Sequence, residues 1–192
     1  MANMASVSYA IEGPQKDLEE ILGAICLAIA KKDNRYEEYK ACEYLGFVEK
    51  ELERSSLGGE IEEEPEIKDG VLRFCAEERW GRQDFCNLLQ ERFPDIKVYW
   101  VVEEADCEVY CTNDKVGKYF PDRYYADVCI DGVYESEYFI TEESMWNWLT
   151  QIAFCGIRSM EDVERFNADY EDSDINDENF IQIHKFEILD GI

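Results

Sequence analysis

The chain has 192 residues, with 45 acidic side chains against 19 basic ones and one histidine, which gives a formal net charge of −26. Its 46% apolar and 14% aromatic content is too high for a disordered acidic segment, so a packed core is expected. The negative charge repels nucleic-acid phosphates and anionic lipid headgroups, which argues against direct binding to nucleic acids or membranes. A basic protein is therefore the natural complement, although high charge by itself also keeps a small protein soluble and monomeric.

The N-terminal part of the chain predicts a strand followed by two helices. Residues 4–11 alternate apolar and small or polar side chains, and this strand ends at Gly13-Pro14. Pro14 suits the first position of a helix, and a second helix is predicted over 36–44. The apolar stripe of the first helix consists of Leu18, Ile21, Leu22, Ile25 and Ile29.

The next part predicts an acidic loop and then a strand, a helix and a strand. Residues 55–69 hold Gly58-Gly59 and a run of glutamates, which favours a solvated loop or insertion. A strand is predicted from Val71 to Ala76 and a helix over 85–93. The strand over 96–102 contains five apolar residues in succession, which predicts a central strand buried on both faces.

The C-terminal half has an antiparallel pattern. After a short strand over 108–112, two strands flank Asp131-Gly132, a pair that favours a two-residue hairpin turn. Thr141 is a suitable helix cap, and Ser159 with Asp162 indicates a further helix start. An acidic loop over 169–179 and a last strand over 180–189 complete the chain.

This order of elements predicts an α+β fold with a mostly antiparallel sheet. We expect a single domain over 1–192, with the acidic loop near 55–69 and a C-terminal extension over 141–192. Most of the eight cysteines lie in apolar helix or strand patterns, and no secretory signal pattern precedes them. The longest apolar run, 21–30, is about half the ~20 residues of a membrane span. A cytoplasmic protein with reduced cysteines is therefore expected.

The middle of the chain resembles a family of small uncharacterised proteins carried on plasmids and prophages, the YubB type. The residues that carry the resemblance are a strand that ends near Trp80-Gly81, a helix that ends in Phe93-Pro94, and a strand that ends in Glu103-Glu104. The resemblance covers roughly 70–104 together with the opening strand and helix. It implies a ferredoxin-like sheet with helices packed on one face, and it supplies no known activity and no catalytic residues.

Three patterns could carry chemistry, and each favours a structural role. Glu103, Glu104, Asp106 and Glu108 cluster around a turn, but the sequence gives no sign of the burial that separates carboxyl pKa values. His184 lies in a strand, and no Gly-x-Ser-x-Gly motif supplies a nucleophile for it. The run 172–178 imitates a Ca²⁺ loop but lacks its glycine and its final glutamate. We therefore expect no catalytic residues, no metal and no cofactor, and the chain is predicted not to be an enzyme.

The strongest candidate for partner binding lies near the C-terminus. Residues 135–178 hold 13 acidic residues and two basic ones, a local net charge of −11. The helix after Thr141 has one apolar stripe for the sheet, and Trp146 and Phe154 lie on a second side. This second side either packs on the following helix or meets a partner. The predicted partner-binding residues are Trp146, Phe154, Asp169, Asp172, Asp174 and Asp177.

The sequence thus favours a non-enzymatic interaction module from a mobile element. The alternative is an acidic inhibitor or immunity-type protein, either a DNA mimic or a binder of a basic protein, since complementary charge raises association rates. An enzyme that uses carboxylates ranks third.

Overall fold

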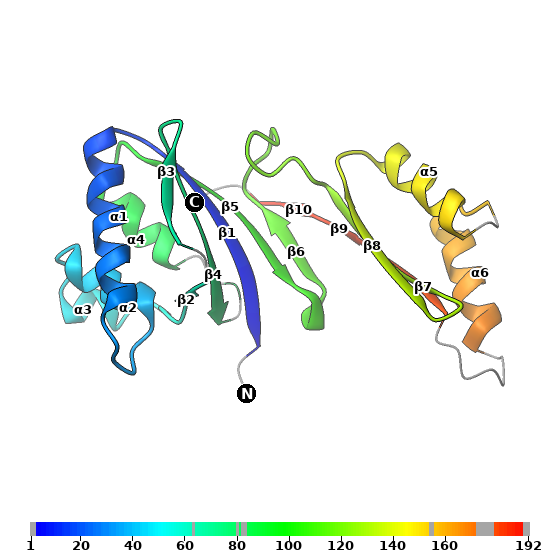
Figure 1. The fold of residues 1–192 in the computed structure, drawn as a ribbon, viewed down its shortest axis with the longest axis horizontal. Helices are drawn as coiled ribbons and strands as arrows, with labels where there is room; N and C mark the ends of the chain where they lie inside the picture. The colour runs from blue at the N-terminus through cyan, green and yellow to red at the C-terminus, as the bar shows by residue number, and fades with distance from the viewer. Residues whose placement is uncertain are drawn as a thin grey trace. The chain divides into compact units, whose positions relative to one another are not determined.

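The computed structural model has an α+β fold with mostly antiparallel strand pairing, as predicted. The chain divides into two compact units: unit 1 comprises Met1–Lys115 and Ile188–Ile192, and unit 2 comprises Val116–Glu187 (Figure 1). The structure describes residues 3–62, 64–79, 81, 84–153, 156–171 and 179–189.

Unit 1 is built on a seven-stranded sheet with the order β10-β6-β5-β1-β4-β2, in which β3 also pairs with β4. β1 lies between β4 and β5 and is antiparallel to both, so Tyr9 stands opposite Phe74 on one side and Trp100 on the other. The strands are β1 (Met4–Glu12), β2 (Glu60–Ile61), β3 (Glu66–Lys68), β4 (Val71–Arg79), β5 (Lys97–Glu104), β6 (Val109–Thr112) and β10 (Glu187–Ile188).

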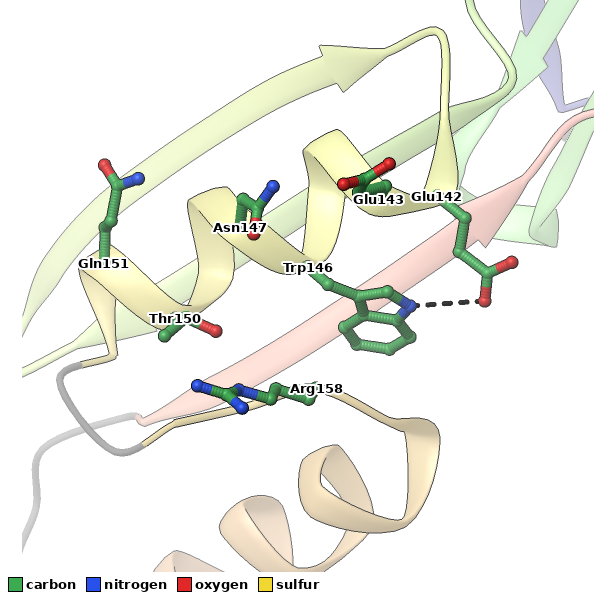
Figure 2. Close-up of a pocket in the computed structure, with 7 residues that line it drawn as sticks. All are labelled: Glu142, Glu143, Trp146, Asn147, Thr150, Gln151 and Arg158. Carbon is green, nitrogen blue, oxygen red and sulfur yellow. Dashed lines mark hydrogen bonds between the residues drawn. The ribbon is translucent and has the colours of Figure 1, made fainter.

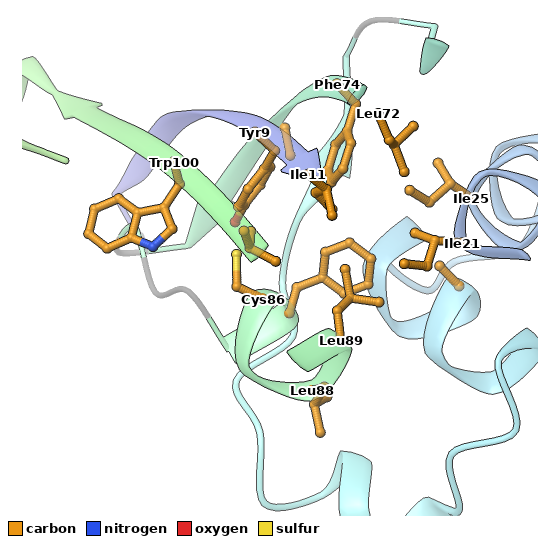
Figure 3. Packing of buried hydrophobic residues seen from close by; sticks show 14 of the residues in the cluster. Tyr9, Ile11, Ile21, Ile25, Leu72, Phe74, Cys86, Leu88, Leu89 and Trp100 are labelled. Atoms are coloured by element: carbon orange, nitrogen blue, oxygen red, sulfur yellow. The ribbon is translucent and has the colours of Figure 1, made fainter. Parts of the chain in front are cut away.

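Helices cover one face of this sheet (Figure 1). The helices are α1 (Gln15–Ala30), α2 (Glu37–Tyr44), α3 (Glu49–Leu52) and α4 (Asp84–Arg92), and a 3-10 turn, η1, spans Ala105–Cys107. Figure 3 shows side chains of β1 and β4 pointing toward Ile21 and Ile25 of α1. Phe74 stacks on Tyr9 with ring centroids 4.7 Å apart and meets Phe85 of α4 at 6.1 Å. The apolar stripe predicted for α1 therefore forms part of the core, apart from Ile29, which is exposed.

The loop predicted over 55–69 is wrong in part, because it contains β2 and β3. Ile61 pairs with Ala76 and Ile67 pairs with Leu72, and both isoleucines pack against the core. Burial of these two apolar side chains outweighs the turn preference of the residues around them. The strand over 96–102 is interior, as predicted, but side chains on its second face are only half-buried.

Unit 2 is a three-stranded antiparallel sheet, β8-β7-β9, with two helices packed against it. Ala126 and Val128 of the middle strand pack with Leu149 of α5 and Val163 of α6. The elements are β7 (Tyr124–Ile130), β8 (Val133–Phe139), α5 (Glu142–Ile152), α6 (Met160–Glu171) and β9 (Phe180–Lys185).

The last strand was predicted as one run over 180–189, and this prediction is wrong. The run breaks at Phe186, where the chain passes from β9 in one sheet to β10 in the other. Phe186 is buried, and its N–H donates to the carbonyl of Arg123 at 2.9 Å. Apolar periodicity continues through the break, so the sequence pattern does not reveal the change of sheet.

The second unit begins at Val116, whereas the sequence suggested an extension that starts at residue 141. The hairpin of β7 and β8 belongs to unit 2 because β7 also pairs with β9, from Tyr124 to Cys129. Whether 1–192 folds as a single domain stays a prediction, since a compact unit need not be one that folds alone.

The hairpin turn at Asp131-Gly132 is confirmed. Both residues have positive φ, 51° and 75°, as a type I′ turn requires, and Ile130 pairs with Val133 across it.

We expect Gly132→Ala to lower the free energy of unfolding by about 1 kcal/mol, because a Cβ there meets no atom and only the positive φ opposes it. Gly23→Ala is the control, since Gly23 lies within α1 with open space around a Cβ. It should raise stability by about 0.5–1 kcal/mol. Urea unfolding followed by circular dichroism measures both, and equal effects of the two substitutions would contradict the assignment of the turn.

Candidate functional site

A groove with a volume of about 800 Å³ lies between α5 and the segment that leads into α6 in unit 2 (Figure 2). We call it the Trp146 groove. Trp146, one of the two aromatic residues predicted for partner binding, lies in it with Arg158 on the opposite wall. The lining residues are Glu142, Glu143, Trp146, Asn147, Thr150, Gln151 and Arg158.

The cap and core of α5 determine which side chains enter the groove. Thr141 caps the helix, as predicted, and its hydroxyl oxygen accepts from the Ser144 N–H at 3.2 Å. Met145 and Leu149 are buried against the sheet, which fixes the rotation of the helix. Trp146, one position after Met145, lies on a second side of the helix, where it is half-buried and packs against the core of unit 2.

Two hydrogen-bonded links hold the opposite wall. The Thr150 hydroxyl donates to the carbonyl of Ile157 at 2.7 Å and thereby ties α5 to the segment before α6. At the start of α6, the Asp162 carboxylate accepts from the Arg158 N–H at 3.1 Å and the Ser159 hydroxyl at 2.8 Å. The predicted helix start at Ser159 is thus confirmed, and these bonds hold the pKa of Asp162 below its usual value.

The chemistry of the Trp146 groove suits a cationic group. The indole N–H of Trp146 donates to Glu142 at 3.2 Å, which places a carboxylate beside the ring (Figure 2). Glu143 is exposed on the same rim. An aromatic ring next to carboxylates attracts lysine and arginine side chains. Arg158 introduces one positive charge on the far wall, and the amides of Asn147 and Gln151 offer both donors and acceptors.

Of the six predicted partner-binding residues, the described structure places the side chain of only Trp146. Asp169 lies in α6, with its side chain outside the described part. The remaining four, Phe154, Asp172, Asp174 and Asp177, also lie outside the described residues.

Sequence reasoning missed a pair of buried acidic side chains in unit 1. Glu38 of α2 and Glu78 of β4 are 1% and 2% exposed, and we call them the carboxyl pair. The Gly59 N–H donates to Glu38 at 2.8 Å, and the Tyr9 hydroxyl donates to Glu78. Burial raises the pKa of both carboxyls, and the negative charge of Glu38 raises the pKa of Glu78 further.

Both members of the carboxyl pair could have been found from sequence periodicity. Glu78 follows Phe74 and Ala76 at strand spacing, and these residues are buried on the same face. Glu38 precedes Ala41 and Cys42 at helical spacing, and they too are buried. In each case an acidic residue occupies a position that the strand or helical spacing assigns to the core, and this predicts a buried carboxyl group.

The carboxylates that the sequence did single out occupy the end of β5 and η1. Glu104 is buried, with Oε1 lacking a hydrogen-bond partner, whereas Glu108 is exposed beyond η1. The side chain of Asp106 lies outside the described part. His184 of β9 stands opposite Tyr125 and stacks on its ring at 5.9 Å, on the sheet face away from buried Ile181.

Within the described ranges, no three His, Cys, Asp or Glu side chains come together as a metal ion would require. No described helix is long and apolar enough to cross a membrane. No protein-family model, curated protein or solved structure matches the chain.

Proposed function

We propose that the protein is a non-enzymatic interaction module that binds a basic segment of another protein in the Trp146 groove. The observation that carries this proposal is an aromatic ring hydrogen-bonded to Glu142 in an open groove that Glu143 also lines. The surrounding chain adds to it, because 135–178 has a net charge of −11. Charge of this sign steers a basic partner toward the groove, and the indole then holds one of its cationic side chains.

Binding at this groove should depend on a few residues. A lysine or arginine over an indole contributes about 0.5–2 kcal/mol, depending on how far the contact is desolvated. Rim carboxylates chiefly raise the association rate, and this contribution falls with added salt. Arg158 should disfavour a uniformly cationic ligand, so we expect a partner segment in which basic residues alternate with polar or acidic ones.

We also propose that unit 1 has a ferredoxin-like arrangement. We further propose that the chain is a member of the YubB-type family of proteins carried on mobile elements. The strand order of unit 1 supports the arrangement: β4 and β5, joined through α4, flank β1, and both are antiparallel to it. The second connection runs from β1 through α1 to β2 and β3, which pair with the outer side of β4. The described cysteines are all free thiols, which accords with a reducing, cytoplasmic location.

The proposed function is tested with fluorescent basic peptides and fluorescence anisotropy. We expect Trp146→Ala to weaken binding about tenfold and Glu143→Gln to weaken it about threefold. Glu164→Gln is the matched control, because Glu164 is an exposed acid of α6 that does not line the groove. Equal losses in all three variants, or no binding by the wild type, would show that the acidity has no role at this groove.

A kinetic measurement tests the role of the acidic residues in the last turn of α6 and after it. Neutralising Asp169, Asp172, Asp174 and Asp177 should slow association and flatten its salt dependence, with little change in dissociation. Affinity purification at low and high salt then separates the two kinds of partner. A basic toxin or nucleic-acid enzyme among the captured proteins would favour the inhibitor or immunity-type alternative.

A further inference from the structure

Each member of the carboxyl pair has one oxygen with a donor and one without. Oε2 of Glu38 accepts from the Gly59 N–H, and Oε1 of Glu78 accepts from the Tyr9 hydroxyl. The two remaining oxygens, Oε1 of Glu38 and Oε2 of Glu78, are buried and have no donor. The carboxyls nevertheless lie within hydrogen-bonding reach of each other. Two carboxyl groups can hydrogen-bond to each other only if one of them carries a proton.

Within the part of the chain that the structure describes, the groups that face the pair do not compensate two negative charges. The titratable groups that face it are Tyr9 of β1, Cys42 of α2, and Asp84 and Cys86 of α4. None of these groups carries a positive charge in any protonation state.

Two described basic side chains on the same elements, Lys40 and Arg79, are engaged elsewhere. Lys40 of α2 donates to the Lys31 carbonyl at 2.8 Å and lies 3.7 Å from Glu37. Arg79, next to Glu78 on β4, lies over the Tyr36 ring at 4.7 Å. Neither compensates the carboxyl pair, so the pair cannot be fully ionised without large repulsion.

We propose that Glu38 and Glu78 share one proton in the folded protein and form a pH-sensitive clasp that fastens α2 and the Gly59 segment to β4. Glu38 supplies both sides of this contact, because its own N–H donates to the Gly59 carbonyl at 3.3 Å while its carboxyl accepts from the Gly59 N–H. Glu37, the preceding residue, accepts from the Ile61 N–H at 2.8 Å and extends the contact into β2. Ionisation of Glu38 places a buried negative charge at this junction and loosens it.

The sign of the pH dependence follows from the direction of the shift. Burial raises the pKa of Glu38 from 4.5 to about 7. A carboxyl whose pKa is raised in the folded state stabilises folding fully below its unfolded pKa, where both states are protonated. This contribution is lost as pH rises from about 4.5 through about 7, because the unfolded chain releases its proton first. The clasp therefore weakens as the solution passes from mildly acidic to mildly alkaline.

The test compares the equilibrium constant for unfolding in urea at pH 5 and pH 8. From pH 5 to pH 8, we expect this constant to rise on the order of a hundredfold more in the wild type than in Glu78→Gln. The amide in that variant can donate to Glu38 and accept from Tyr9 without a shared proton. Glu77→Gln is the matched control, since Glu77 is the exposed neighbour on β4, and it should follow the wild type. Parallel pH profiles for the wild type and Glu78→Gln would overturn the proposal.

A second measurement needs no variant and covers the case in which Glu78→Gln fails to fold. Infrared spectroscopy of the wild type should show the carbonyl band of a protonated carboxylic acid at pH 6, where exposed carboxyls are ionised. This band should weaken as the pH rises through about 7, where Glu38 ionises, whereas Glu78, whose pKa is raised well above its usual value, keeps its proton. A folded protein without that band at pH 6 would also overturn the proposal.

Discussion

Gly59→Ala should lower the free energy of unfolding by about 2–4 kcal/mol, because it disrupts a buried carboxyl contact. A Cβ on residue 59 would overlap the carboxyl group of Glu38. Glu38 would have to withdraw, which breaks its hydrogen bond with the Gly59 N–H and leaves both groups unsatisfied in a buried position. Urea unfolding at pH 6, followed by circular dichroism, measures the loss.

The neighbouring glycine provides the control for this prediction. A Cβ on Gly58 would meet Cδ of Arg79 at 3.0 Å, and Arg79 is an exposed, flexible side chain that can move aside. We expect Gly58→Ala to change stability by less than about 1 kcal/mol. If both variants lose a comparable free energy of unfolding, the loss arises from the backbone conformation of this segment and not from the contact with Glu38.

The largest effect on stability is expected from Phe85→Ala, at about 3–5 kcal/mol. Phe85 is fully buried in the core of unit 1 and meets the edge of the Phe74 ring. Its removal leaves a cavity between α4 and the sheet that the neighbouring side chains fill only in part. Phe85→Leu retains most of the apolar volume and should cost less than about 2 kcal/mol. Urea unfolding measures the loss in free energy of unfolding for both variants. Equal losses would contradict tight packing around Phe85.

Hydrogen exchange on Phe85→Ala also tests the expected single domain. In a single domain, destabilisation of unit 1 lowers the protection of slowly exchanging amides in both units together. In a chain of two separately folding units, the amides of β7 and α5 would keep their wild-type protection. The experiment thus decides whether the two compact units fold together.

Sequence periodicity predicted the elements of this protein well where a strand or helix buries one regular stripe. The alternation at Val7, Tyr9 and Ile11 and the helical spacing in α1 gave β1 and α1 nearly to the residue. The turn at Asp131-Gly132 was predictable because only a few residue pairs adopt two successive positive φ angles at low cost.

The parts that could not be predicted depend on contacts between distant segments. β2 and β3 are strands because Ile61 and Ile67 find partners on β4, and nothing local distinguishes them from a loop. The contact of Glu38 with Glu78 joins residues 40 positions apart, so periodicity shows that each is buried but not that they meet. Trp146 was predictable as a residue on a second helix side, whereas Arg158 became part of the groove only through the Thr150 hydrogen bond.

The position of β10 has a consequence for truncation. Leu189, which directly follows β10, donates its N–H to the carbonyl of Thr112 at 2.9 Å and packs on the core of unit 1. Unit 2 is therefore inserted into the sequence of unit 1, because the chain leaves unit 1 after Lys115 and returns to it at Ile188. A stop codon a few residues early would therefore strip an edge strand from the sheet that the N-terminus began. Truncation at the C-terminus would thus destabilise the sheet that contains the N-terminal strand β1.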